Sequence, residues 1–344
     1  MVCFAHSQAL RNKRLSNLTR MSEQLPPAGG FRLEACPACG SQRERFHGER
    51  GTRPSSALGR RSSSVTTGTK LTLYCCLNCD VVYSNPQPRD QVYEKYVDQE
   101  YDVAAYFEVI ESRKRVLFER RLDAIGPPAP GRNRMIDVGC ADGQFIKLAA
   151  ERGWQPFGIE MNPSAVAKAR EGGAVVWQGT LEEVDDIEWG SFDVVCSWDS
   201  IEHTPTPTDF AKRFANLIAP GGSGEITTLN RKSLVARLRG MRWSMVVDDH
   251  FTYWSGQSLE RILESNGLQV SGTHYFGLGR DLVAFLDGAR ASRPAGEIVD
   301  LGDAPAPTWD TKSSVLSAEG IVNRLLDSSR LGVGVWVSVS RPAD

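Results

Sequence analysis

Three groups of residues in the sequence have types and spacings that can do chemistry. The first is a pair of knuckles, Cys36-Pro-Ala-Cys39 and Cys76-Leu-Asn-Cys79. Four thiolates can hold a tetrahedral Zn²⁺, and a four-cysteine site leaves no open position for catalysis. The 36 residues between the knuckles include a stretch rich in Arg, Ser, Thr and Gly, residues 50–69. The pattern therefore predicts a structural zinc module with an insertion, and reduced cysteines without a metal are the alternative.

The second group is a glycine turn that follows a short apolar run. Gly139-Cys-Ala-Asp-Gly143 has the spacing Gly-x-x-x-Gly, which disfavours a dinucleotide pyrophosphate. Glu160 lies 17 residues beyond Gly143, at the end of the next apolar run. A carboxylate there can accept hydrogen bonds from both hydroxyls of a ribose. The pair predicts a ligand that contains ribose, and the alternative is a plain turn followed by an exposed glutamate.

The third group is a pair of histidines, His203 and His250, in a chain with 5 histidines. Histidine is suited to taking a proton near neutral pH, so each is a candidate general base. The alternatives are a loop-capping histidine at the first position and a packed core histidine at the second. Asp199 and Glu202, together with His203, also form an oxygen and nitrogen set that could bind Mg²⁺.

The elements that must position these residues alternate between strand and helix patterns. This alternation predicts an α/β fold, a doubly wound, seven-stranded, mostly parallel sheet with helices on both faces. Pro220-Gly221-Gly222 is expected to form a turn that ends the third helix. Strands are predicted over residues 135–138, 156–160, 174–177, 192–197, 225–229, 268–275 and 331–340, and helices over residues 144–152, 163–171, 209–217 and 258–265.

Four segments are predicted along the chain. Residues 1–30 are expected to be a disordered basic extension, with a transit peptide as the alternative for its first part. Residues 31–88 form the zinc module, and residues 89–130 form a helical linker or lid. Residues 131–344 form the α/β domain.

Composition limits the class of protein. Apolar residues make up 41% and charged residues 24%, which is ordinary for a globular protein. The run Leu331–Val339 is too short for the roughly 18 residues of a membrane span, so no membrane partner is expected. Residues 1–75 hold 12 Lys and Arg against 4 Asp and Glu, although the whole chain has a net charge of -2. Residues 1–75 and the rest of the chain are therefore expected to bind different partners.

The cysteine pattern also bears on location. Cysteines grouped in knuckles, instead of spread as a disulfide framework, and charges that begin at Arg11 predict a cytoplasmic protein. The sequence leaves open whether translation starts at Met1 or at Met21.

Taken together, these motifs resemble the class I S-adenosylmethionine-dependent methyltransferases, in a methyltransferase-23-like subgroup with an N-terminal zinc ribbon. The resemblance extends over most of residues 31–340. One departure is Cys140-Ala141-Asp142, where the family more often has further glycine. The segments that carry the resemblance are Ile136–Gly143, Gly153-Trp154, Phe157–Glu160, Gln178–Glu182, Phe192–Val195, Asp199–His203, Pro220–Gly222, Arg242-Trp243 and His250–Ser255.

The resemblance implies S-adenosylmethionine as cofactor. It implies that Asp137 and the glycine turn hold the methionine end, that Glu160 holds the ribose, and that Thr180 and Leu181 flank the adenine. The full set of implied cofactor-binding residues is Asp137, Gly139, Cys140, Ala141, Gly143, Glu160, Met161, Thr180, Leu181 and Trp198.

The resemblance further implies methyl transfer to a small-molecule acceptor. O-methylation in a biosynthetic or secondary-metabolite pathway is the main expectation, with His203 or His250 as the base. Some quinone-pathway members are thought to use a metal at the loop that contains His203. The alternatives are a sugar C-methyltransferase and an RNA methyltransferase that grips nucleic acid with its zinc ribbon and basic N-terminal part.

Overall fold

The computed structural model describes residues 31–51, 70–97, 115, 117–277 and 318–343. The predicted disordered extension over residues 1–30 and nearly all of the Arg/Ser-rich insertion lie outside this part. The middle of the predicted helical linker, residues 98–114, also lies outside it. The two ends of that linker are helical, as α2 (Arg89–Val97) and over residues 117–125.

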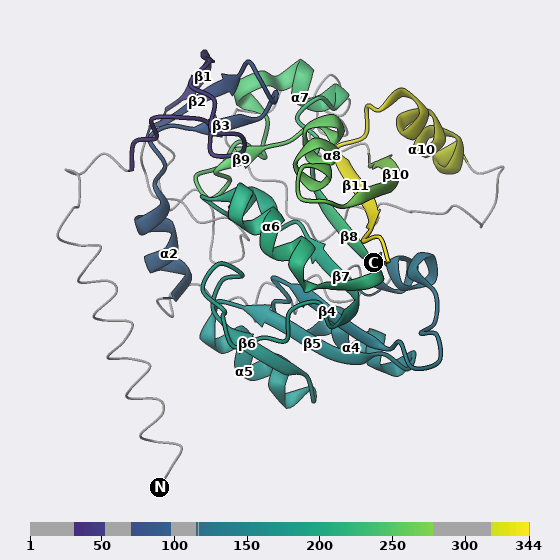
Figure 1. The fold of residues 1–344 in the computed structure, drawn as a ribbon. Helices are drawn as coiled ribbons and strands as arrows, with labels where there is room; N and C mark the ends of the chain where they lie inside the picture. The colour runs from purple at the N-terminus through teal and green to yellow at the C-terminus, as the bar shows by residue number, and fades with distance from the viewer. Residues whose placement is uncertain (1–30, 52–69, 98–114, 116, 278–317, 344) are drawn as a thin grey trace, which may run out of the picture.

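A seven-stranded sheet forms the centre of the molecule (Figure 1), with the strand order β10-β11-β8-β7-β4-β5-β6. The five strands from β8 to β6 in this order run parallel, and β11 is antiparallel to both β8 and β10. The predicted doubly wound, mostly parallel sheet is therefore confirmed. The strands are β4 (Arg134–Val138), β5 (Gln155–Glu160), β6 (Val175–Gln178), β7 (Phe192–Trp198), β8 (Ile218–Leu229), β10 (Gln269–Phe276) and β11 (Gly334–Ser340).

Helices cover both faces of this sheet because its strands bury side chains on both sides. Successive side chains of a strand point to opposite faces. Met135 of β4 accordingly packs with apolar residues of α4 and α5, whereas Ile136 packs with apolar residues of α6 and α8. The helices are α4 (Gln144–Glu151), α5 (Pro163–Glu171), α6 (Pro207–Leu217), α7 (Leu234–Arg239), α8 (Gly256–Glu264) and α10 (Ala318–Ser329), with short 3₁₀ turns η2 (Ile201–His203) and η3 (Gly240–Arg242).

The predicted turn at Pro220-Gly221-Gly222 is wrong, because these residues lie inside β8. Helix α6 ends at Leu217 as predicted, and β8 begins at the next residue. Gly221 adopts a φ of +68°, so the strand bends there without leaving the sheet. The segment after β11 completes the pairing, since the Gly221 N–H donates to the Arg341 carbonyl and the Arg341 N–H donates to the Gly222 carbonyl.

A second sheet joins the N-terminal cysteine segment to the α/β domain. Its strands are β1 (Glu44–Arg50), β2 (Leu71–Cys76), β3 (Val82–Ser84) and β9 (Thr252–Tyr253), paired antiparallel in that order. The first three strands precede the main sheet in the sequence, but β9 follows β8 (Figure 1). The two segments therefore share a single hydrogen-bonded sheet.

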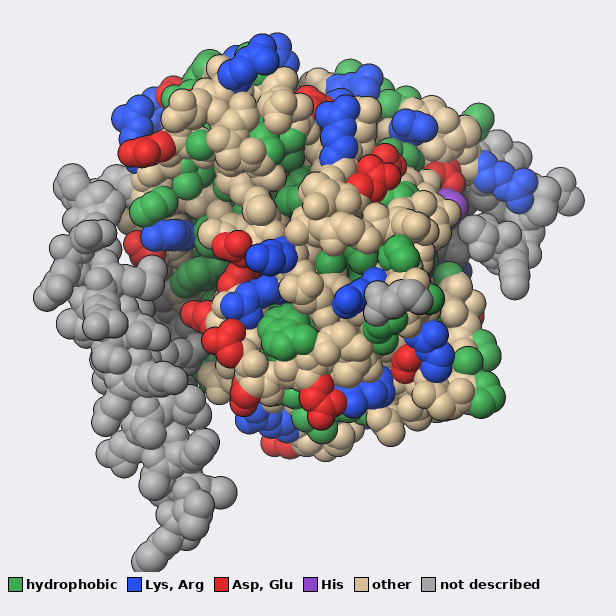
Figure 2. All heavy atoms as spheres, in the orientation of Figure 1, with side chains coloured by type: hydrophobic (Ala, Val, Ile, Leu, Met, Phe, Trp, Pro, Cys, Tyr) green, Lys and Arg blue, Asp and Glu red, His purple; other side chains and the backbone are tan. Residues whose placement is uncertain are grey.

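Basic side chains gather over this shared sheet. In Figure 2, Lys and Arg lie along the upper part of the molecule, over β1–β3 and α7, with some Asp and Glu among them. Exposed cations in this region include Arg45 of β1 and Arg237 and Arg239 of α7.

Glu225 of β8 is a charged group buried in the main sheet. Its carboxylate accepts hydrogen bonds from the indole N–H of Trp336 and the hydroxyl of Ser338, both on β11. Burial raises the pKa of Glu225 to about 7, above its usual value of 4.5. The folded chain therefore holds this proton more tightly than the unfolded chain. The resulting stabilisation is full below the unfolded pKa and is lost as the pH rises through the folded pKa.

Glu225→Gln should remove this pH dependence, because an amide oxygen still accepts a hydrogen bond but does not ionise. Between about pH 4 and pH 8, the unfolding free energy of wild type should fall by about 3 kcal/mol relative to the variant. Urea denaturation across this range measures it, with Glu264→Gln on the exposed side of α8 as the matched control. A constant difference between wild type and Glu225→Gln at every pH would contradict the assignment.

Candidate functional site

A cavity of about 430 Å³ lies at the carboxyl ends of β4, β5 and β7. Ligands of open α/β sheets bind at this edge, outside the ends of the parallel strands. Of the residues predicted to bind a cofactor, all except Gly143 line the cavity. Those that do are Asp137, Gly139, Cys140, Ala141, Glu160, Met161, Thr180, Leu181 and Trp198.

The turn after β4 requires its two glycines for different reasons. Gly139 has a φ of +80°, and a Cβ there would collide with the hydroxyl of Ser200. Gly143, also at +80°, caps α4, and a Cβ there would lie 2.8 Å from the Cβ of Ala169 on α5. Gly143 thus sets how closely two helices pack, which explains why it does not line the cavity. Ala141 takes a left-handed φ of 51° in place of the further glycine usual in this turn.

Glu160, at the end of β5, is fixed by the backbone on both carboxylate oxygens. The Ala141 N–H donates to Oε2 at 2.9 Å, and the Asn162 N–H donates to Oε1 at 2.7 Å. Burial raises the pKa of this carboxyl, and these N–H donors oppose the rise. Each oxygen keeps a second lone pair, so the carboxylate can still accept hydroxyl hydrogen bonds on the cavity side.

Arg121 is a cavity residue that the sequence analysis missed. Its side chain is 4% exposed, and its guanidinium carbon lies 4.1 Å from the ring centroid of Trp198. Within the described part of the chain, it is the only Lys or Arg that lines the cavity. Burial lowers its pKa, and the carboxylates of Asp199 and Asp137 counter this effect. The signal in the sequence that could have indicated this role is that Arg121 lies beside Phe118 and Leu122, which are buried on an apolar face of the same helix.

His203 and His250 come together although 46 residues separate them in the sequence. Their ring centroids lie 4.7 Å apart, and both line the cavity. Nδ1 of His203 lies 2.8 Å from the Asp249 carbonyl oxygen, and Nδ1 of His250 lies 2.9 Å from that of Met245. A carbonyl oxygen only accepts, so Nδ1 carries the proton in both neutral rings and Nε2 keeps a lone pair. Burial lowers the pKa of His250 well below its ordinary value.

Glu202 completes a cluster with the two histidines. It is 2% exposed, and Oε2 accepts a hydrogen bond from the Thr228 hydroxyl at 2.8 Å. One ligand atom from each of Glu202, His203 and His250 lies within 4.8 Å of the others. This cluster has His250 where the sequence predicted Asp199, whose Oδ1 instead accepts a hydrogen bond from the Thr227 hydroxyl at 2.9 Å.

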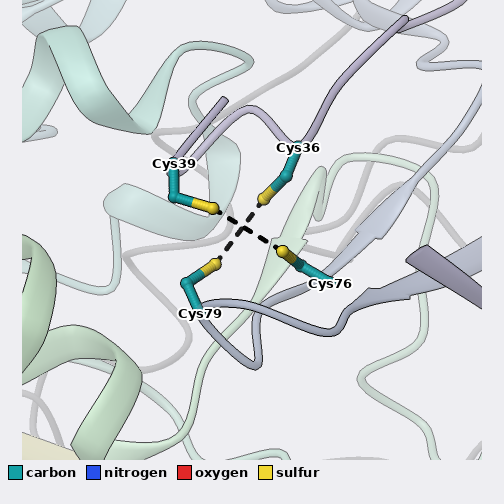
Figure 3. A group of neighbouring side chains, drawn as sticks. All are labelled: Cys36, Cys39, Cys76 and Cys79. Carbon is teal, nitrogen blue, oxygen red and sulfur yellow. Dashed lines mark hydrogen bonds between the residues drawn. The ribbon is translucent and has the colours of Figure 1, made fainter. Parts of the chain in front are cut away.

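The four cysteines of the two knuckles also converge (Figure 3). Their sulfurs point toward one centre and lie within 4.8 Å of one another. Cys36 and Cys79 face each other at 3.6 Å, as do Cys39 and Cys76. The convergence predicted from the spacing is therefore present, and the donor set of four sulfurs is one that suits Zn²⁺.

The cysteine segment contacts the cavity wall through β3 and β9. The Ser84 N–H donates to the Phe251 carbonyl at 3.0 Å, and the Phe251 N–H donates to the Glu202 carbonyl at 2.8 Å. Asp80, which follows the second knuckle, forms ion pairs with Arg231 and Lys232 just beyond β8. The backbone that carries Glu202 and His250 is thus hydrogen-bonded, through Phe251, to the end of the cysteine segment.

Helix α2 covers another side of the cavity. The Asn162 side chain donates to the Tyr96 carbonyl at 2.8 Å, and the Tyr96 hydroxyl donates to Asp249 Oδ2 at 3.0 Å. Tyr93 packs edge-on against Phe251. Tyr96 therefore connects Asn162 to Asp249. Asn162 follows Met161, which is predicted to bind the cofactor, and Asp249 precedes His250, a candidate base.

Comparison with known proteins identifies the family. Residues 111–271 match the model of a family described as a methyltransferase domain. The ubiquinone biosynthesis O-methyltransferase of Aeromonas salmonicida is 31% identical over 173 residues, which cover 45% of this chain and 73% of that protein. The chain belongs to the class I S-adenosylmethionine-dependent methyltransferases.

Further relatives and solved structures match part of this methyltransferase. The ubiquinone biosynthesis O-methyltransferase of Xanthomonas oryzae is 35% identical over 117 residues, which are 32% of this chain and 46% of that relative. Among solved structures, an S-adenosylmethionine-dependent methyltransferase from Archaeoglobus fulgidus has a TM-score of 0.46 and 18% identity, covering 69% of this chain and 99% of its own. A methyltransferase from Thermotoga maritima has a TM-score of 0.47 and 13% identity, covering 72% and 99%.

The family match contains the glycine turn, Glu160 and both histidines of this methyltransferase, whereas the cysteine segment lies before it. Within the described residues, no helix is long and apolar enough to span a membrane.

Proposed function

We propose that this methyltransferase transfers the methyl group of S-adenosylmethionine to a hydroxyl of a small-molecule acceptor. The observation that carries the proposal is that one cavity is lined both by Glu160 with the glycine turn and by the pair of His203 and His250. The O-methyltransferase names of the curated relatives support oxygen as the acceptor atom.

The cavity suits the chemical groups of the cofactor, which supplies a methyl group on a sulfonium. Glu160 would accept hydrogen bonds from the ribose hydroxyls, since both of its oxygens keep a free lone pair. Thr180 and Leu181 would flank the adenine. At the methionine end, Asp137 would face the ammonium group, and Arg121, a buried cation packed on Trp198, would bind the carboxylate.

The histidines would act on the acceptor. Methyl transfer forms an O–C bond as the S–C bond breaks, and the hydroxyl must lose its proton. A ring nitrogen with a free lone pair can take that proton, and such general base catalysis contributes about 10²–10⁴ in rate. Because Nδ1 of each ring is held by a backbone carbonyl, Nε2 is the nitrogen available to the acceptor.

The cavity walls give the acceptor its shape. Apolar and aromatic side chains line the same cavity as the histidines, and they suit an acceptor with an apolar body whose polar group is the hydroxyl. These side chains are Tyr93, Leu117, Phe118, Phe210, Leu229 and Met245.

The four-cysteine cluster would hold a structural Zn²⁺. Its ligands are all thiolates and leave no open position, so the metal would stabilise the segment without entering the reaction. The contact from Ser84 through Phe251 to Glu202 would make that stabilisation important to the cavity wall as well.

Glu160→Ala should weaken S-adenosylmethionine binding, because two ribose hydroxyls lose their acceptor. The expected loss is about 1–3 kcal/mol, measured by titration calorimetry. Glu171→Ala, an exposed glutamate at the end of α5, is the matched control and should bind as wild type does. Equal affinity of Glu160→Ala and wild type would remove the ribose assignment.

His203→Ala should lower turnover by about 10²–10⁴ without changing cofactor affinity if His203 is the base, and His250→Ala should do so if His250 is the base. His274→Ala alters a histidine that pairs with Asp327 on the exposed part of β10, so its turnover should stay at the wild-type level. Single-turnover rates with a hydroxyl acceptor measure the effect. Full rates in both cavity variants would mean that positioning alone drives the transfer.

Purified protein should contain one Zn²⁺ per chain by elemental analysis. Cys39→Ser should lose the metal and lower the unfolding temperature, because metal binding supplies folding free energy. Cys75→Ser is the matched control, since Cys75 is a buried neighbour outside the cluster of four. Zinc content near zero in wild type after chelator-free purification would refute the assignment.

A further inference from the structure

We propose that Asp249 is a positioning residue for the methyl transfer and that it acts through His203, which is the general base. The hydroxyl of Tyr96 holds the Asp249 carboxylate in place. The inference deepens the proposed function, on which it rests, because it assigns the base to one of the two histidines.

Asp249 lies behind His203 and faces its ring with two oxygen atoms. The backbone carbonyl of Asp249 accepts a hydrogen bond from Nδ1 of His203 at 2.8 Å, and Oδ2 of the Asp249 carboxylate lies 3.9 Å from the same nitrogen. The Asp249 side chain is buried and does not line the cavity, whereas His203 does. The carboxylate can therefore influence an acceptor in the cavity through His203 and not by contact.

Hydrogen bonds between two segments hold this arrangement. The residues after Asp249 run beside η2, the turn that ends with His203. The Phe251 N–H donates to the Glu202 carbonyl at 2.8 Å, and the Thr252 hydroxyl donates to the carbonyl of the residue before Glu202 at 3.4 Å. The distance between the carboxylate and the ring is therefore set by segments that are bonded to each other.

Tyr96 of α2 fixes the carboxylate itself. Its hydroxyl donates to Oδ2 of Asp249 at 3.0 Å, and this is the oxygen that faces His203. The backbone carbonyl of Tyr96 accepts a hydrogen bond from the Asn162 side chain at 2.8 Å, which ties α2 to the end of β5. A hydroxyl that donates to a carboxylate favours its charged form and restricts its orientation.

A buried carboxylate behind the ring assists a histidine that acts as a base. When the O–C bond forms and the S–C bond breaks, the hydroxyl proton passes to Nε2 of His203 and the ring becomes positively charged. A carboxylate on the Nδ1 side stabilises that charge and keeps the ring oriented. The attraction is stronger at a buried site than in water, because the surroundings screen it less.

His250 is held in a way that suits a base less well. Its Nδ1 donates to the Met245 carbonyl, burial lowers its pKa well below the ordinary value, and a positive charge on His203 lowers that pKa further. A ring that resists protonation is a weak base. Glu202 faces both rings, but burial raises the pKa of its carboxyl to about 7, so it carries only part of a negative charge near neutral pH. The geometry therefore favours His203.

Single-turnover methyl transfer by the full chain tests the inference. The acceptors are para-cresol and benzyl alcohol, two isomers that present a phenolic and an alcoholic hydroxyl on one apolar ring. Asp249→Asn keeps the shape of the side chain and an oxygen acceptor for Tyr96. It should slow the transfer about 10–100-fold, because the charged partner of the ring is lost. Tyr96→Phe keeps the backbone bond to Asn162 and should also slow the transfer.

A double-mutant cycle separates this role from a structural one. In a His203→Ala background, Asp249→Asn should cause less than about 2-fold further loss, because the residue through which it acts is already gone. In a His250→Ala background, it should still cause the loss of about 10–100-fold. Asp248→Asn removes the adjacent carboxylate, which does not line the cavity, and should transfer at the wild-type rate.

Calorimetry with S-adenosylmethionine should show the wild-type affinity in each variant, so that a slower transfer reports on the reaction and not on the cofactor site. A wild-type rate in Asp249→Asn would overturn the inference and leave the proposed function standing. A full additional loss in the His203→Ala background would do the same. Failure of wild type to methylate either acceptor while it binds the cofactor would instead contradict the proposed function, and with it the inference.

Discussion

The pairing of two short strands, β3 and β9, is the contact on which the cavity wall depends. It joins residues before the main sheet to the segment that carries His250, through the register of Val82 with Tyr253 and Tyr83 with Thr252. Backbone hydrogen bonds then continue from Ser84 to Phe251 and on to Glu202. Short strands gain stability mainly from their neighbours. The position of the histidine pair is therefore a property of the whole fold and not of one loop.

The opposite wall of the cavity is set by the backbone of one turn and by Glu160, which follows this turn 19 positions after Ala141. The turn after β4 alternates left-handed residues at Gly139, Ala141 and Gly143, and the N–H of Ala141 fixes Glu160. Such a turn is formed by residues close in sequence, because it follows from glycine freedom and the end of one strand. One wall is thus locally specified, and the other is assembled from distant segments.

This difference explains how much the sequence could predict. The parallel strands, the glycine turn and Glu160 were predicted because each depends on local spacing. The meeting of His203 with His250 depends on where β9 docks, and no local pattern encodes that contact. Arg121 stayed hidden because a cation on an apolar helix face has no motif of its own. The bend at Gly221 was misread because a glycine pair marks a turn and a bent strand equally well.

The shared sheet also affects the order of events during synthesis. The pairing partner of Val82 lies 171 residues later in the chain, at Tyr253. At about 5–20 residues per second, the ribosome needs roughly 10–35 s to supply that partner. Until then, the edge of β3 that pairs with β9 has backbone N–H and C=O groups without their hydrogen-bond partners. Such an edge can pair with other chains. The nascent protein is accordingly most exposed to misassembly over this interval, after its cysteine knuckles have been made and before the segment that carries His250 and β9 emerges.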